Sequence, residues 1–269
     1  MRATKSKNRR YLIAGAAVLV IGVSACTLAL LSPALGPIEG TIAPQLYVDR
    51  VAGAQIPAQG RFVLVDAKSA RLYMIQDGRV QDSMRVIVGK PDTPTPALKD
   101  VINYETVNPY WHVTPDLAKS LIAPRVLERG DAYLSAQGYE VLSGWGPDAK
   151  VLSPDSVDWK AVAAGQASVY VRQRPGPANS LGHYKFDLPN GDGIYLHDTP
   201  KKELFAQDNR GLSHGCVRLE DAPRLARWLL GKDPPEGGPP EENVLLPKPV
   251  PITISYLDDQ SRTQLASLF

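Results

Sequence analysis

The sequence predicts a mainly β domain, a compact sheet sandwich, that follows an N-terminal membrane segment and carries an α-helical insertion. Three observations predict this class. Short strand-like runs separated by turn signals begin near Arg61, helical patterns replace them between residues 101 and 166, and an uncharged apolar stretch spans residues 11–32. At 269 residues with 43% hydrophobic residues, the chain is long enough to bury one main core.

The first 32 residues have the pattern of a single-pass signal anchor in the inner (cytoplasmic) membrane. Residues 1–10 are basic and are expected to stay in the cytoplasm, and residues 11–32 are long enough to cross a bilayer as one helix. This orientation places the remaining chain in the periplasm, or otherwise outside the cytoplasm. Cleavage of the segment is an alternative, and so is lipidation at Cys26, because Val23-Ser24-Ala25-Cys26 is similar to a lipobox.

The domain itself is expected over residues 61–257. Residues 33–60 are rich in Pro, Gly and Ala and are interpreted as a linker. Strand-like runs at residues 62–66, 72–75 and 84–88 predict an antiparallel start, and Asp77-Gly78 is a hairpin signal between the second and third runs. The prolines of KPDTPTP, residues 90–96, then stop the sheet because proline lacks a ladder donor.

The insertion is expected over residues 101–166. It contains a helical run at residues 117–128, interrupted by Pro124, and a short capped helix from Asp158 to Gly165. The remaining elements are strands at residues 168–172, 184–188 and 194–197, a helix at 221–230 that ends at Gly231, a last strand at 251–257 and a C-terminal tail at 258–269.

The charge of the exported part excludes a nucleic-acid partner. Five of the 30 Lys and Arg residues precede residue 33, where no Asp or Glu occurs, so 25 basic and 28 acidic residues follow, a formal charge of −3. Binding to a phosphate backbone needs a dense basic face with interleaved aromatic side chains, and the sequence has no such pattern.

Cys216 is the cysteine that can carry chemistry, because Cys26 lies in the apolar segment and no disulfide is expected. It follows Gly215 at a turn, and His197 ends the strand-like run before it. A thiol is a good nucleophile only as the thiolate, and a neighbouring imidazolium lowers its pKa. We therefore expect Cys216 and His197 to meet as nucleophile and base, with peptide N–H groups near Gly215 as oxyanion donors.

Two alternatives stay open from the residues alone. Cys216 can be a small buried apolar residue, and the histidines can be core residues whose ring nitrogens have hydrogen-bond partners. Cys216, His214 and His197 can also be zinc ligands, although their spacing matches no recognised zinc site, so no metal is expected. A papain-like peptidase also uses Cys and His, but its cysteine precedes its histidine. Four further residues are interpreted as structural or packing positions: His112, His183, Trp145 and Trp159.

His197 is followed, after about fifteen intervening residues, by Ser-His-Gly-Cys and then an Arg. This pattern resembles the signature of the YkuD-type L,D-transpeptidase catalytic domain. The segments VGKPDTPTP, NPYWHVTP, VRQRPGPANSLG and IYLHDTP resemble the larger branch of that family, whose domain carries a helical lid. The resemblance covers residues 61–257 and implies an L,D-transpeptidase-type β-sandwich with the insertion as its lid.

The resemblance also implies a role for each site residue. Cys216 matches the acylated nucleophile, and His197 matches the base. Asp198 orients that imidazole through its main-chain carbonyl. His214 and Gly215 match the oxyanion and turn positions. The implied substrate-binding residues are Arg218, Tyr195 and Ser213, and Arg218 is expected to contact a carboxylate of the substrate.

The implied reaction acts on the stem peptides of peptidoglycan and needs no cofactor. The cysteine attacks the third residue of a tetrapeptide stem, D-alanine leaves, and a side-chain amine of a neighbouring stem, usually of diaminopimelate, takes the acyl group in a 3→3 cross-link. Alternatives are an L,D-carboxypeptidase, a D-amino-acid exchanger, a protein-to-peptidoglycan attachment enzyme and a wall-binding protein without activity. The resemblance further implies acylation by carbapenems. No separate peptidoglycan-binding pattern precedes residue 61, so we expect the lid and the anchor to direct targeting. For Trp145 and Trp159 of the lid, contact with glycan or peptide is the alternative to packing.

Overall fold

The computed structural model describes residues 47–51 and 54–269. The expected signal anchor at residues 11–32 and Cys26 lie outside these residues. Among the helices that the structure describes, none is both long and apolar enough to span a membrane.

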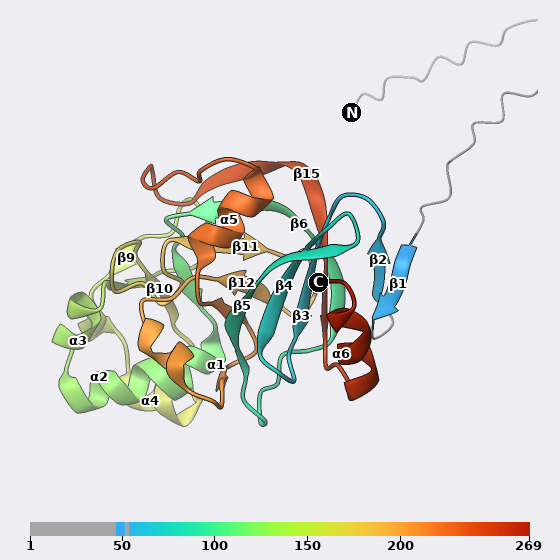
Figure 1. The fold of residues 1–269 in the computed structure, drawn as a ribbon. Coiled ribbons are helices and arrows are strands. Elements are labelled where there is room, and N and C mark those ends of the chain that lie inside the picture. Colours follow the sequence, from blue (N-terminus) through green and yellow to red (C-terminus); the bar gives the residue numbers. More distant parts are fainter. Residues whose placement is uncertain (1–46, 52–53) are drawn as a thin grey trace, which may run out of the picture. The chain divides into compact units, whose positions relative to one another are not determined.

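A nine-stranded sheet forms the body of the domain (Figure 1). Its strands are β3 (Arg61–Asp66), β4 (Arg71–Gln76), β5 (Arg79–Gly89), β6 (Leu98–Val107), β11 (Tyr184–Asp187), β12 (Tyr195–His197), β13 (Gly211–Ser213), β14 (Val217–Leu219) and β15 (Glu242–Ser255). They lie in the order β13-β5-β14-β12-β11-β6-β15-β3-β4, and β4 also pairs with β5. All of them except β13 therefore close into a barrel, which corrects the expected sandwich.

The length of β5 makes this closure possible. Its residues Arg79–Arg85 pair with β4, and Val86 and Ile87 pair with β14. One strand of 11 residues therefore has β4 along one edge and β14 along the opposite edge. Closure leaves fewer unpaired strand edges than a sandwich of separate sheets.

The antiparallel order of β3, β4 and β5 was expected, and the structure confirms it. Asp77 and Gly78 have φ values of +52° and +75°, as a two-residue hairpin turn requires. Alternate residues of β3 serve two cores: Val63 and Val65 point into the barrel core, and Phe62 and Leu64 belong to a second cluster outside it.

The second cluster draws on segments that were expected to be a linker and a tail. Strands β1 (Tyr47–Val51) and β2 (Ala54–Pro57) form a hairpin, and α6 (Asp259–Ala266) follows β15. Val51 and Ile56 are fully buried, and Leu265 and Leu268 pack in the same cluster. These additions cover the outer face of β3, whose apolar side chains would otherwise contact water.

The barrel core is completed by α5 (Ala222–Leu230). Asp221 caps its N-terminus by accepting a hydrogen bond from Arg224 N, and Gly231 ends it at φ +72°. Leu225 and Leu229 are fully buried, and Trp228 is partly buried against the same core.

The insertion leaves the barrel after β6 and returns at β11, and it is not purely helical. Residues 98–107 belong to the barrel strand β6, and a four-stranded sheet in the order β7-β10-β8-β9 lies beside the helices. The sheet consists of β7 (Trp111–Val113), β8 (Tyr139–Leu142), β9 (Val151–Leu152) and β10 (Tyr170–Gln173). Strands of two to four residues are too short to reveal their alternation in the sequence.

The helices of the insertion pack on one face of that sheet and form a separate core. They are α1 (Pro115–Leu117), the π-helix η1 (Ala118–Ile122), α2 (Ala123–Arg129), α3 (Ala132–Ala136), the 3₁₀ turn η2 (Pro154–Ser156) and α4 (Trp159–Ala164). The π-helical turn lies immediately before Pro124, so the helical run continues through the expected interruption. The predicted capped helix is confirmed: Asp158 accepts from Ala161 N, and Gly165 ends α4 at φ +74°.

Candidate active site

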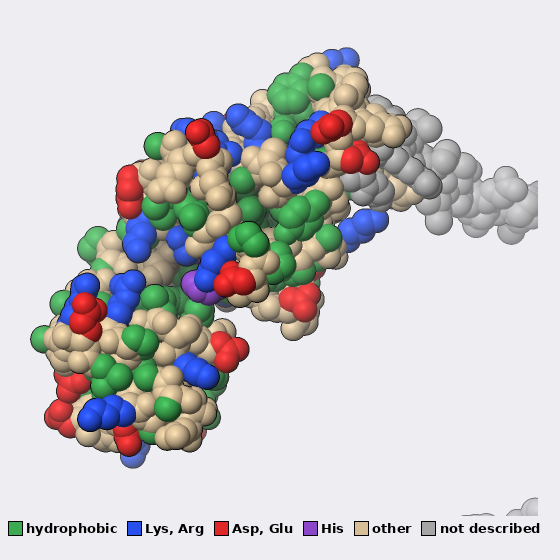
Figure 2. All heavy atoms as spheres, turned by 90° about the horizontal axis from the view of Figure 1, so that it is seen from below, with side chains coloured by type: hydrophobic (Ala, Val, Ile, Leu, Met, Phe, Trp, Pro, Cys, Tyr) green, Lys and Arg blue, Asp and Glu red, His purple; other side chains and the backbone are tan. Residues whose placement is uncertain are grey.

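A cavity of about 220 Å³ is lined by residues of both the barrel and the insertion. Seen from below, Lys and Arg side chains gather around a hollow in which a histidine is visible (Figure 2). The insertion contributes an apolar and aromatic wall of Trp111, Leu117, Leu121, Tyr133, Tyr139 and Leu181. The barrel contributes most of the residues expected at the site: Tyr195, His197, Ser213, His214, Cys216 and Arg218.

Strand pairing brings the reactive residues to one face of the sheet. Strands β12 and β14 are parallel, with Leu196 beside Val217 and His197 beside Arg218. Because side chains alternate along a strand, His197 and Arg218 share a face, and Leu196 and Val217 point to the opposite one, into the core. Cys216 directly precedes β14 and lines the same cavity as His197.

The imidazole of His197 is held in one orientation by its own loop. Its Nδ1 faces the main-chain oxygen of Asp198 in a short hydrogen bond. A carbonyl oxygen can only accept, so Nδ1 carries the proton and Nε2 has the free lone pair. Burial lowers the pKa of His197 to about 3, and the positive charges of Arg218 and Lys185 act in the same direction against an opposing contribution from Asp198. The ring is therefore a neutral base.

The thiol of Cys216 is also neutral at rest. Burial raises its pKa above the ordinary value, and hydrogen bonding with Tyr195 and the charges of Lys185 and Arg218 oppose the rise. Its Sγ lies 3.7 Å from the main-chain oxygen of Gly193. The expected imidazolium beside a thiolate is thus replaced by two neutral groups, because both are removed from water.

The turn before Cys216 is braced by two hydroxyl groups. Ser213 Oγ donates to Cys216 O at 2.6 Å and accepts from Gly215 N at 3.1 Å. Ser213, which was expected to bind substrate, lines the cavity, and the proton of its hydroxyl is engaged in this turn. The Gly215 N–H is likewise engaged, whereas the Cys216 N–H has no hydrogen-bond partner among the described residues.

The second hydroxyl belongs to Thr95, which the sequence reasoning did not single out. Thr95 Oγ1 donates to Gly215 O at 2.6 Å and accepts from Gly89 N at 2.9 Å, and the residue is buried. In a trans peptide the C=O and the following N–H point in opposite directions. By holding the Gly215 carbonyl, Thr95 therefore orients the Cys216 N–H in the direction opposite to the Thr95 hydroxyl. From the sequence, its motif KPDTPTP predicts only the end of the sheet and a family resemblance.

Gly215 has φ +118°, a conformation that favours glycine, and a Cβ atom there would lie 3.2 Å from Ile194 Cδ1. His214, its neighbour, is exposed at the cavity, and burial together with Lys90 lowers its pKa. Tyr195 is half-buried, with its ring 5.7 Å from that of His197, and burial and the nearby Cys216 raise its pKa well above the ordinary value.

The charge of the cavity suits an anionic ligand. Its lining contains no Asp or Glu but includes Arg218, Arg125 of the insertion and Lys201. Arg218 is partly buried, burial lowers its pKa, and it has no carboxylate partner in the part of the chain that the structure describes. A desolvated guanidinium without a partner favours a bound carboxylate. Arg125 and Lys201 are additions that the sequence did not indicate, because their helix and loop come together only in the fold.

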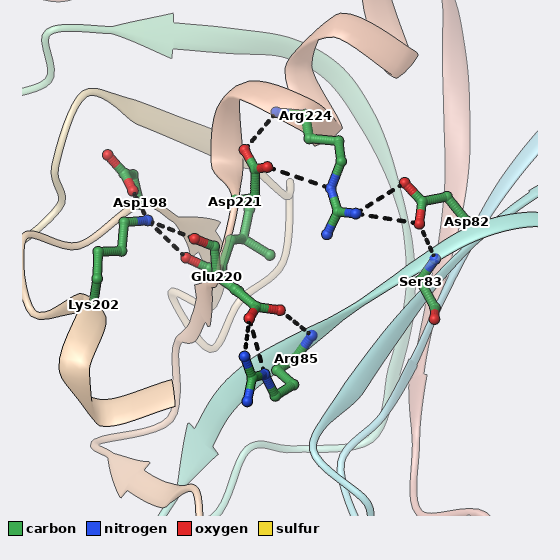
Figure 3. A network of polar contacts seen from close by, with 9 residues as sticks. Asp82, Ser83, Arg85, Asp198, Lys202, Glu220, Asp221 and Arg224 are labelled. Atoms are coloured by element: carbon green, nitrogen blue, oxygen red, sulfur yellow. Dashed lines mark hydrogen bonds and ion pairs between the residues drawn. The ribbon is translucent and has the colours of Figure 1, made fainter. Parts of the chain in front are cut away.

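The side-chain carboxylate of Asp198 makes different contacts from its main-chain carbonyl. Asp198 Oδ2 accepts from His183 N at 3.0 Å, and Lys202 Nζ lies 2.7 Å from Asp198 Oδ1 (Figure 3). The same ammonium donates to the main-chain oxygens of Glu220, at 2.8 Å, and Leu219, at 3.3 Å. The network thus joins the loop after His197 to the end of β14.

The discounted residues lie elsewhere. Trp159 is buried in the core of the insertion as expected, and His112 and Trp145 do not line the cavity. Among the described residues, no three His, Cys, Asp or Glu side chains cluster as a metal site would require.

Comparisons with known proteins support the sequence resemblance. The family model of the YkuD L,D-transpeptidase catalytic domain matches residues 60–252. A curated Haemophilus influenzae protein, named provisionally as an L,D-transpeptidase, is 34% identical over 192 residues, which are 71% of this chain and 38% of that protein. The chain thus spans less than half the length of this relative.

Solved structures are similar only at a distance. An L,D-transpeptidase from Mycobacterium smegmatis has 16% identity and a TM-score of 0.36, with 76% of this chain and 64% of that chain covered. The catalytic domain of an Enterococcus faecium L,D-transpeptidase acylated by ertapenem has 13% identity and a TM-score of 0.36, with coverage of 73% and 98%.

Proposed function

Because the chain belongs to the L,D-transpeptidase family, we propose that it is a cysteine-dependent acyltransferase that forms 3→3 cross-links between peptidoglycan stems. One observation carries the proposal: His197 and Arg218 lie on one face of β12 and β14, beside Cys216, around a cavity that has no acidic side chain. The proposed setting is the outer side of the inner membrane, with residues 11–32 as the anchor.

The first half-reaction uses the neutral base. His197 Nε2 takes the thiol proton as Sγ turns from Gly193 O and attacks the carbonyl on the L-centre of the third stem residue. The oxygen of the tetrahedral intermediate becomes negative, and the unengaged Cys216 N–H is placed to donate to it. His197 then protonates the departing amine of D-alanine as the C–N bond breaks, which leaves a thioester on Cys216.

The second half-reaction reverses the proton path. His197 takes a proton from the side-chain amine of a neighbouring stem, and this amine attacks the thioester and releases the thiol. Arg218 suits a carboxylate of the donor stem, because it lines the cavity and lacks an acidic partner among the described residues. Water, a free D-amino acid or a protein amine can replace the acceptor, which gives the carboxypeptidase, exchange and attachment activities.

The decisive experiment is mass spectrometry of the products from a defined disaccharide tetrapeptide. We expect a 3→3 dimer with loss of D-alanine, and no product from Cys216→Ala with its fold retained. If the products contain a tripeptide stem but no dimer, water is the acceptor. Intact-mass measurement after incubation with a carbapenem should show one adduct, mapped to Cys216. An unmodified protein that forms no product contradicts the proposal and favours a wall-binding protein without activity.

A further inference from the structure

A group of aromatic side chains lies outside the cavity, on the outer face of the insertion sheet. It consists of His112 on β7, Tyr170 on β10 and Trp145 in the loop between β8 and β9, and we call it the aromatic platform. Trp145 and Tyr170 are 46% and 42% exposed, and the His112 side chain is 47% exposed. Single exposed apolar residues are common, whereas neighbouring exposed rings mark interaction sites.

The rings of the platform hold one another in place. Trp145 lies 5.0 Å from His112 and 5.3 Å from Tyr170 between ring centroids, with interplanar angles of 80° and 83°. The Trp145 loop is closed at its base, where Ser143 N donates to Lys150 O and Lys150 N donates to Ser143 Oγ. An exposed tryptophan that is already fixed loses little conformational entropy when a ligand covers it.

The sheet alternation separates the platform from the insertion core. Trp111, Val113, Val141 and Val171 point to the core side, and their neighbours His112 and Arg172 therefore point outward. Trp111 also lines the catalytic cavity. One small sheet thus has the cavity wall on one face and the platform on the other.

The platform is bordered by charged groups of both signs. Arg172 Nε donates to Glu140 Oε2 at 2.8 Å, and its guanidinium lies over the Tyr110 ring at 4.4 Å. His112 Nδ1 lies 3.9 Å from Glu241 Oε1. These acidic groups disfavour nucleic acid and anionic membranes. Exposed ring faces bordered by paired donors and acceptors instead suit a neutral ligand that has apolar faces and many hydroxyl groups.

We propose that the aromatic platform binds the glycan strand of peptidoglycan. The apolar faces of the pyranose rings stack on Trp145 and Tyr170, and Arg172 and Glu140 form hydrogen bonds with hydroxyl and acetamido groups. The inference rests on the proposed function, because a substrate whose stem peptide enters the cavity is attached to, or lies next to, such a strand. Through the platform, the enzyme binds the glycan polymer independently of the stem peptide.

The test uses glycan strands freed of their stem peptides by an amidase, with the full chain carrying Cys216→Ala so that turnover is absent. We expect saturable binding, and roughly fivefold to tenfold weaker binding when Trp145→Ala or Tyr170→Ala is added. Phe269→Ala is the matched control, because Phe269 is an exposed aromatic residue outside the platform and is expected to leave binding unchanged. Equal affinity of the Trp145 and control variants, or no glycan binding at all, overturns the inference.

A second measurement separates this inference from the proposed function. With catalytic Cys216 present, Trp145→Ala should turn over a soluble sugar-free tetrapeptide at the unaltered rate but lose activity on intact sacculi. If the unaltered enzyme binds glycan but forms no product from either substrate, the proposed function fails and the platform stands. If Trp145→Ala lowers turnover of the sugar-free peptide as strongly as that of sacculi, Trp145 acts on the peptide site, and the glycan assignment is wrong.

Discussion

Lys202 Nζ lies 2.7 Å from Asp198 Oδ1 and 2.8 Å from Glu220 O, so one ammonium group joins the loop after His197 to the chain that follows Cys216 and β14. The main-chain carbonyl of Asp198 in turn holds the His197 ring. The orientation of the base therefore depends on a side chain that does not line the cavity.

Replacing Lys202 should impair catalysis more than substrate binding. We expect Lys202→Met to lower kcat roughly tenfold with KM nearly unchanged, because a base displaced by a fraction of an ångström takes the thiol proton less readily. Lys202→Arg should restore part of the loss. Steady-state kinetics with a soluble tetrapeptide measures both constants. Lys232→Met, at an exposed position, is the control. A change in KM alone would refute this role.

Thr95 should be needed for both stability and rate. Thr95→Val removes the hydroxyl that joins Gly89 N to Gly215 O and leaves two buried polar groups unpaired, at a cost of about 1–3 kcal/mol in the free energy of unfolding. Release of the Gly215 carbonyl also frees the Cys216 N–H to rotate, so kcat should fall at temperatures where the variant remains folded. Thr95→Ser, which keeps the hydroxyl, is the comparison in denaturant titrations and kinetics.

The alkylation of Cys216 should show a neutral resting thiol. Burial raises the pKa of Cys216, so the thiolate fraction, and with it the rate of reaction with iodoacetamide, should be low at pH 7 and continue to rise above the pH at which free cysteine levels off. Peptide mapping by mass spectrometry separates Cys216 from Cys26. A rate that is already at its plateau below pH 7 would instead demonstrate a thiolate–imidazolium pair.

Glu105 should make the stability depend on pH. Its side chain is fully buried in β6, neither carboxylate oxygen has a hydrogen-bond partner among the described residues, and burial raises its pKa to about 7. The folded protein therefore binds this proton more tightly than the unfolded chain. Stability should fall as pH rises from about 4.5, the unfolded value, to about 7, by about 3 kcal/mol in total.

Glu105→Gln should remove this part of the pH dependence. An uncharged amide of similar shape needs no proton to remain in the core, so the variant should be more stable than the unaltered protein above pH 7 and nearly equal to it below about pH 4.5. Urea titrations at several pH values measure the difference. An unchanged slope of stability against pH between 5 and 7 would show that Glu105 does not titrate there.

Much of the local structure was predictable because neighbouring residues determine it. The Asp77-Gly78 turn, the cap at Asp158 and the glycine ends at Gly165 and Gly231 all lie where the sequence placed them. The mainly β class and the family also followed from residue patterns. The closed barrel did not, because closure depends on β5 having two partners, which no local pattern records. The insertion sheet was missed because its strands are too short.

By itself, the sequence determined the family and predicted a sulfur nucleophile and a histidine base, because these depend on residue identity and spacing along the chain. Only the tertiary structure decided the protonation of Cys216 and His197, since their neutrality comes from burial by the fold. The same holds for Thr95, which is 120 positions from the Gly215 carbonyl that it binds, and for the platform that unites His112, Trp145 and Tyr170. Contacts of this kind depend on the packing of distant segments, and a linear pattern does not specify them.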